Sequence, residues 1–242
     1  MMVPRPRHLV HAAALVAIAL AGAGCNVLGV AAAALPPPTV EAAYGGLAQR
    51  ETAVIVWASP EVDVDNPGLT VQVGKRIESN LKTASTSGGR GAKKVLEGVS
   101  FPYPTESYAR YLRQDPTLGT LPPSDLAARA STERVIYVEL YNFTTRGGSA
   151  QSLVRGVADA NLVVFEIDNP VRAAADTPSL SGREPASVRE VYREAAIRVT
   201  FPEKGPEDGS NTLSPQRAYS GLIMGVADAV SKRFVPHAAP EF

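Results

Sequence analysis

Reactive side chains are scarce in this chain, which has one cysteine, Cys25, and three histidines among its 242 residues. A single cysteine excludes an internal disulfide, so packing alone must hold the fold together. The longest mainly apolar run, Leu9–Leu20, has about a dozen residues and includes His11, whereas a membrane-spanning helix needs roughly 20 apolar residues. Neither sign of charge dominates, with 24 basic and 24 acidic residues. Nucleic acid is therefore not an expected partner, because it would require a basic face.

The first residues have the order of a secretory signal. Arg5 and Arg7 precede the apolar run, and the small residues Ala21–Gly24 follow it, directly before Cys25. A charged, an apolar and a small-residue segment in this order are typical of an export signal. The sequence therefore predicts a signal peptide over residues 1–24, with cleavage between Gly24 and Cys25.

The junction at Cys25 resembles the lipobox of bacterial lipoproteins, in which the cysteine thiol accepts a diacylglycerol and becomes the new N-terminus. Gly22 stands where these families usually have leucine, and ordinary cleavage after Ala21-Gly22-Ala23 is the alternative. The resemblance implies a lipid-anchored protein that faces the periplasm. Asn26 follows the cysteine, and the lack of aspartate there favours the outer membrane over the inner one.

Little catalytic chemistry remains once the signal is removed. His237 is then the only histidine, and its place near the end of the chain favours a partly exposed tail residue. With one histidine and no usable thiol, the sequence offers no Cys–His pair, no Ser–His–Asp triad and no His-rich zinc site. We therefore predict no catalytic residue, no cofactor and no metal site.

The chain divides into an anchor, a tether and one domain. Residues 25–49 are rich in alanine and include Pro36–Pro38, without a persistent apolar period, which predicts a flexible tether. Residues 50–235 are enough for a single core, and residues 236–242 form a C-terminal tail.

Hydrophobic periodicity predicts the elements of this domain. Asn66 and Pro67 are expected to start the first helix, and residues 169–189 are expected to form an exposed loop. The expected strands are 52–57, 94–99, 134–144, 153–168 and 191–201, and the expected helices are 69–81, 105–113, 124–130 and one from Ser214-Pro215 onward. The fold class is α/β (α+β): a single mixed sheet of about five strands with helices packed on it, in the order β-α-β-α-α-β-β-β-α.

This order resembles a periplasmic domain of bacterial envelope lipoproteins. The likeness is carried by residues 54–57, the helix at 69–81, the junction from Asp125 to Val138 and the terminal helix. Similar domains include the lipoprotein activator of a penicillin-binding protein, the curli secretion lipoprotein and the N-terminal domain of TolB, although members often have Gly-Ala-Asp where this chain has Ser131-Thr132-Glu133. Short strings such as Tyr137-Val138-Glu139-Leu140 also resemble uncharacterised planctomycete-type lipoproteins.

Two motifs share part of their spacing with known ligand sites. The acids of Glu61–Asn66 have the spacing that begins a calcium loop, but Asn66 stands where glycine is required and Gln72 where a bidentate glutamate is required. Gly74-Lys75 has the wrong distance to Gly68 for a phosphate loop and falls inside the predicted helix. Both patterns favour helix structure over a ligand site.

One aromatic cluster is the best candidate for a partner surface. It contains Phe101, Tyr103, Tyr108 and Tyr111. Tyrosine is favoured in protein contacts and in stacking on sugars, and core packing of a short helix is the alternative. Gly221, Gly225 and Ala229 form a line of small residues on the terminal helix, which favours close packing on a sheet over helix pairing in lipid.

The leading hypothesis is a non-catalytic cell-envelope lipoprotein, whose tethered periplasmic domain binds a protein partner as an adaptor. Its partners would be the membrane, through the N-terminal lipid, and an envelope protein. One alternative is a subunit of an envelope secretion or transport assembly, and the sequence leaves a homo-oligomer open. The other alternative is a carboxylate-based hydrolase acting on envelope glycan, which would need two acids converging in a cleft.

Overall fold

The computed structural model describes residues 38–87, 90–145, 156–170, 187–203 and 214–239. The predicted signal peptide, Cys25 and most of the predicted tether lie outside these residues. The chain divides into a large unit of residues 41–237 and a small one made of residues 1–40 and 238–242. The short strands β1 (Thr39–Val40) and β6 (His237–Ala238) pair as a two-stranded sheet.

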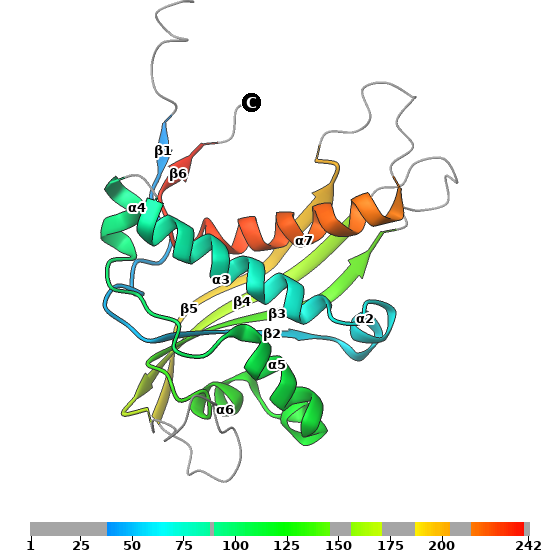
Figure 1. Cartoon of the computed structure of the whole chain (residues 1–242), viewed down its shortest axis with the longest axis horizontal. Helices are drawn as coiled ribbons and strands as arrows, with labels where there is room; N and C mark the ends of the chain where they lie inside the picture. Colours follow the sequence, from blue (N-terminus) through cyan, green and yellow to red (C-terminus); the bar gives the residue numbers. More distant parts are fainter. Residues whose placement is uncertain (1–37, 88–89, 146–155, 171–186, 204–213, 240–242) are drawn as a thin grey trace, which may run out of the picture. The chain divides into compact units, whose positions relative to one another are not determined.

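The large unit is built on a four-stranded mixed sheet (Figure 1). Its strands are β2 (Thr52–Ala58), β3 (Arg134–Thr144), β4 (Gly156–Asp168) and β5 (Ser187–Phe201), in that spatial order. β2 and β3 are parallel, whereas β3, β4 and β5 are antiparallel neighbours in sequence order. A parallel pair needs a long crossover, and the helical segment between β2 and β3 provides it. The predicted mixed α/β class is confirmed.

The crossover and the C-terminal region supply the helices. They are α2 (Pro60–Asp65), α3 (Leu69–Ser87), α4 (Arg90–Val95), α5 (Thr105–Gln114), the 3-10 helix η1 (Pro116–Thr120), α6 (Pro123–Ala128) and α7 (Pro215–Ser231). α7 begins as the sequence predicts, because Ser214 caps it by accepting a hydrogen bond from the Arg217 amide and Pro215 occupies its first turn.

The two long helices α3 and α7 cover one face of the sheet (Figure 1). The apolar residues of α3 recur every four positions, and this stripe is fully buried. It packs with the inward residues of α7 on alternate residues of all four strands. The buried contributors are Leu69, Val73, Ile77, Leu81, Leu222, Val226, Val230, Val54, Val56, Ile136, Val138, Ala160, Leu162, Val164 and Ile197.

Three short helices, α5, η1 and α6, pack on the other face. Here the strands contribute the alternate set Ala53, Ile55, Val135, Tyr137, Val163, Phe165 and Ile167. Tyr108 of α5 is fully buried, and its hydroxyl donates to the carbonyl oxygen of Ala130 over 2.8 Å. Among the described residues, these sheet residues lie in the half of the face that the short helices cover.

Two expectations for the crossover are corrected. Residues 94–99 are predicted as a strand, but Lys94 and Val95 end α4 and the chain then turns at Gly98, whose φ is +68°. The segment reaches β2 only through a bridge between Ser100 and Glu51, so the main sheet has four strands instead of about five. Asn66 does not start α3; it ends α2, where its side-chain amide donates to the Val62 carbonyl.

The folded unit also begins before the expected boundary at residue 50. Leu47 is fully buried in the core under α3 and α7, and Tyr44 packs against that core. The buried guanidinium of Arg134 holds this segment by donating to the Tyr44 hydroxyl and to the Gly46 carbonyl, each over 3.2 Å. At the other end of the sheet, β5 starts at Ser187, inside the segment that is predicted to be an exposed loop.

Candidate functional site

The predicted aromatic surface is not assembled in the structure. Tyr108 is 1% exposed and Tyr103 is 9% exposed, and their rings meet edge to face in the core under α5. Tyr111 packs beside the same core, whereas Phe101 packs on the opposite side of the sheet, beneath the Lys82 ammonium. The four residues divide between two cores, so core packing, the alternative interpretation of the sequence, accounts for them.

A groove lies along the outer side of α7 and has a volume of about 760 Å³. One wall is a polar stripe of α3, and Phe201 at the end of β5 forms part of the other side. The stripe comprises Arg76, Ser79, Asn80 and Thr83, with Ala84 at its end. Residues 76 to 84 of a helix extend about 12 Å, so the groove can accommodate two or more turns of a second helix.

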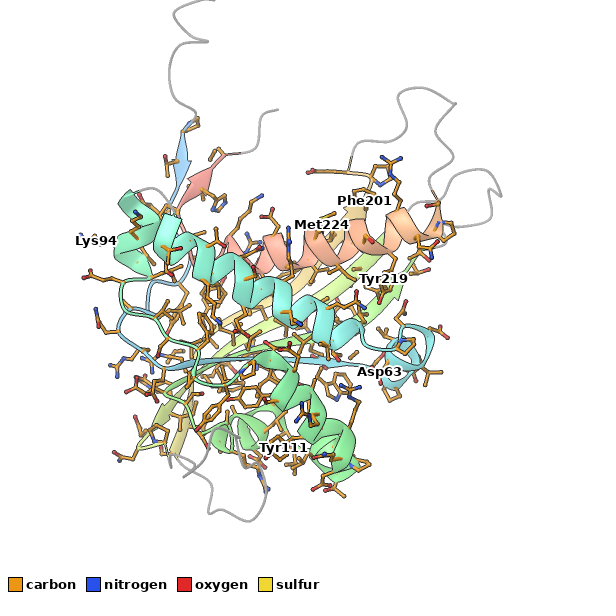
Figure 2. All side chains as sticks on the ribbon, in the orientation of Figure 1. Asp63, Lys94, Tyr111, Phe201, Tyr219 and Met224 are labelled. Carbon is orange, nitrogen blue, oxygen red and sulfur yellow. The ribbon has the colours of Figure 1, made fainter. Side chains whose placement is uncertain are left out.

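Small residues of α7 shape this groove. A Cβ atom on Gly221 would lie 2.5 Å from the ring of Phe201, and one on Gly225 would lie 2.6 Å from a methyl group of Val199. The small-residue line predicted from the sequence is therefore used for close packing on β5. Between the two glycines, Met224 points outward with 48% of its surface exposed, and Figure 2 places it beside α7 together with Phe201.

The charges of the groove leave a small positive excess. Asp228 and Lys232 form an ion pair of 2.7 Å on α7. Across from them, Arg76 makes no hydrogen bond or ion pair with another described residue. A ligand that places a carboxylate opposite Arg76 would gain an ion pair without breaking one, whereas a cationic ligand would meet repulsion.

A smaller pocket of about 240 Å³ lies beside the carboxyl end of β2. Its lining includes Trp57, Asp63, Thr70 and Arg113, and Figure 2 labels Asp63 on α2. The Arg113 guanidinium is held along its own helix by donating to the Ala109 carbonyl over 3.2 Å. This pocket is near the place where α/β sheets often bind ligands.

Ion pairs on the side of the sheet that α3 and α7 cover have a structural role. Arg233 donates two hydrogen bonds to Glu194, of 2.6 and 2.7 Å, and the Tyr192 hydroxyl donates a third of 2.8 Å. The Arg233 hydrogen bond is the main reason why the pKa of Glu194 lies below its usual range. Burial, followed by the bond to Glu194, raises the pKa of Tyr192 to about 12. This cluster fastens the end of α7 to β5.

A second cluster joins Arg134 and Arg189 to the Glu166 carboxylate, and the Arg189 hydrogen bond is the main cause of a lowered Glu166 pKa.

His237 lies in β6, where its Nδ1 is 3.1 Å from the Val235 carbonyl oxygen. Among the described residues, no group of three or more His, Cys, Asp or Glu side chains could hold a metal ion. None of the helices in the described ranges is long and apolar enough to cross a membrane.

Comparisons with protein-family models, with curated proteins and with solved structures find no match for this chain. Function must therefore be inferred from the side chains and surfaces of the molecule itself.

Sequence reasoning missed the groove for a definable reason. Its walls come from residues 76–84, 221–235 and Phe201, which are distant in the chain. The signal that could have found it is Met224, an apolar residue on the polar side of the terminal helix. On its own such a residue is common on protein surfaces, and only the fold shows that it borders a groove.

Proposed function

We propose that this protein is a non-catalytic, lipid-anchored adaptor of the cell envelope, and that it binds a helix of a partner protein in the groove along α7. The observation that carries the proposal is the groove itself: a concave surface of about 760 Å³ with an exposed methionine and small residues at its base. Methionine adapts to apolar partners, and amphipathic helices bind in grooves of this kind.

Shape and charge support this occupant over others. The groove follows the helix axis of α7, so a rod-like ligand can lie along it. Its base is apolar, whereas Arg76, Asn80 and Lys232 border it with polar groups. A partner helix would therefore present an apolar stripe toward Met224 and an acidic side chain toward Arg76.

The export signal and Cys25 support the location of the adaptor. A lipid at Cys25 would keep the domain at a membrane, and the tether that follows would let it reach a partner in the periplasm. The adaptor role is inferred from the sequence resemblance to envelope lipoproteins.

The anchor is tested by comparing wild type with Cys25→Ala in a bacterial host that processes lipoproteins. We expect the wild-type protein to fractionate with outer membranes and to carry the mass of a lipidated Cys25, whereas Cys25→Ala should be soluble in the periplasm. A wild-type protein that is cleaved but lacks lipid would overturn the anchor and leave the groove to be judged separately.

The groove is tested with a photocrosslinking amino acid at position 224 in the membrane-bound protein. Position 64 on α2 is the matched control, because Val64 is also apolar and is 79% exposed. We expect one envelope protein to be crosslinked from position 224 and not from position 64, and Arg76→Glu to weaken that adduct severalfold. Equal adduct yields from both positions, or a yield from position 224 that Arg76→Glu does not change, would contradict the proposal.

A further inference from the structure

The sheet face that α5, η1 and α6 cover has a second half with a different character. In the described part of the chain, the fully buried core of this face ends at Tyr137 and Val163, and half-buried Trp57 packs against its edge. Beyond them β3 and β4 present polar and aromatic side chains: Glu139, Tyr141, Asn142, Asp159 and Asn161, joined by Arg198 of β5 and Trp57 of β2. We call these seven residues the polar face.

Two β-bulges shape this half of the sheet. On β3 the register shifts between Leu140 and Asn142, so that Tyr141 is an extra residue and lies on the same side as Asn142. On β5 the register shifts opposite Ala160 and Leu162, and Ala196 there has a φ of +59°. Left-handed backbone at a residue other than glycine is uncommon, and bulges often occur beside functional sites, where they redirect side chains.

Both bulges flank the same short stretch of β4, and its polar side chains are held firmly. Asn161 donates to Glu139 over 2.9 Å, and its carbonyl oxygen accepts from the Ala196 amide over 3.2 Å. The left-handed residue is therefore tied to the central strand by a side chain of the polar face. This arrangement orients the Asn161 amide before any ligand arrives.

Asp159 is the second fixed group. Arg198 donates to its two carboxylate oxygens over 2.7 and 3.2 Å, and Asn142 donates over 2.8 Å. The hydrogen bond from Arg198 is the main cause of the lowered pKa of Asp159, and the bond from Asn142 adds to it against the opposing effect of burial. Asp159 therefore stays ionised at neutral pH, which does not suit the general acid of a glycosidase.

Aromatic surface borders the fixed polar groups. Tyr141 is 42% exposed, and half-buried Trp57 lies opposite Glu139 in the parallel register of β2 and β3, between Tyr141 and the core under the short helices. From ordinary strand geometry, positions 57 and 141 are on the order of 8 Å apart, a separation suited to adjacent rings of an oligosaccharide. Aromatic rings next to oriented amides and carboxylates offer both stacking and hydrogen bonds.

The charge of the polar face argues against other ligand classes. Arg198 and Asp159 neutralise each other, which leaves no positive excess for nucleic acid. No continuous apolar stripe is present among the seven residues for an amphipathic helix. Oriented hydrogen-bonding groups, aromatic surface and little net charge are the complement of a neutral, polyhydroxylated molecule.

We propose that the polar face binds a neutral oligosaccharide without cleaving it, stacking sugar rings on Tyr141 and Trp57 and binding their hydroxyl groups with Asn161, Glu139 and Asn142. This site is on the opposite side of the sheet from the α7 groove and does not depend on the adaptor proposal. The same chemistry fits a soluble sugar and an envelope polysaccharide, and the experiment separates them.

The chain has a single tryptophan, so its fluorescence reports on Trp57 directly. The full chain carrying Cys25→Ala would be titrated with chitotetraose, cellotetraose and maltotetraose, with calorimetry as the second readout, and then sedimented with insoluble peptidoglycan. We expect saturable binding of at least one tetrasaccharide without release of shorter products. Sedimentation would show that the polar face also binds the glycan strands of an envelope polymer, and its absence would exclude peptidoglycan as the source of the sugar.

Tyr141→Ala should weaken this binding by roughly five- to tenfold, the typical effect of one lost stacking contact. Met224→Ala is the matched control, because Met224 is similarly exposed but lies in the α7 groove, and it should bind as the parent does. Absence of binding by both readouts at millimolar sugar, or a Tyr141→Ala variant that is folded and binds normally, would overturn the proposal. Asn142→Ala, which keeps both rings, should also weaken binding if Tyr141→Ala does not fold.

Discussion

The two faces of the sheet are built differently. Two long helices cover one face, and they bury aliphatic residues from all four strands. On the other face, three short helices bury one half in the described part of the chain, with tyrosines and Phe165 contributing much of the core. The first face therefore buries more apolar area, and apolar burial is the main favourable contribution to folding.

A small domain can combine stability with exposed polar surface when its two sheet faces are packed differently. The strands of a sheet are shared by both faces, so firm packing against α3 and α7 also holds the half of the other face that has no helix over it in the described part. Bulges and a left-handed residue can be accommodated there because the opposite face fixes the strands.

The largest loss of stability should come from a substitution on the face that α3 and α7 cover. Leu162→Ala removes a fully buried side chain between the sheet and the two long helices, and we expect a loss of about 3 kcal/mol in the free energy of unfolding. Tyr141→Ala on the polar face should cost less than about 0.5 kcal/mol, because Tyr141 is exposed. Urea unfolding of both variants provides the measurement, and comparable losses would refute the contrast between the faces.

A smaller effect is expected under the short helices. Tyr108→Phe removes a buried hydroxyl and leaves the Ala130 carbonyl without that donor, which should cost about 1–2 kcal/mol. Tyr111→Phe is the matched control on the same helix, since the Tyr111 hydroxyl makes no hydrogen bond with another described residue. Thermal denaturation would compare the pair, and equal melting temperatures would show that the hydroxyl of Tyr108 contributes nothing.

The third prediction concerns how the free energy of unfolding depends on pH. Because the pKa of Glu194 is lowered in the folded state, its carboxylate stabilises the fold above the unfolded pKa and loses this contribution as the pH falls through the folded value. Glu194→Gln should therefore cost about 1 kcal/mol at pH 7, a modest figure because the pair is partly exposed.

The difference from wild type should shrink below about pH 4, near the usual pKa of glutamate. Unfolding curves recorded from pH 7 to pH 3 test this. A difference that stays constant over that range would assign the loss to packing instead of charge.

Much of the fold could be predicted from periodicity. The helices α3 and α7 follow their apolar patterns closely because each has a buried stripe of helical period. The strands β2 and β3 follow theirs because a continuous apolar run is buried on both faces of the sheet. The prediction of a strand at 94–99 is wrong, because a short apolar stretch does not distinguish a strand from the end of a helix. In the structure Lys94 and Val95 end α4, and the chain turns at Gly98.

The candidate sites were harder to predict. Tyr108 was grouped with three other aromatic residues by their closeness in sequence, but strand alternation and helix facing divide them between two cores. The polar face joins Trp57, Glu139, Asn161 and Arg198 from four strands, and its bulges depend on pairing between strands. A sequence read from end to end has no local signal for such a register shift.

One backbone hydrogen bond has a consequence for protein engineering. The amide of Tyr44, near the start of the large unit, donates to the carbonyl of Arg233, near its end, over 2.9 Å. The chain therefore enters and leaves this unit at neighbouring points, as in domains that tolerate insertion into other proteins. Residues 41–237 should be transplantable as a cassette into a surface loop of a carrier protein, with short linkers and no need for the natural anchor.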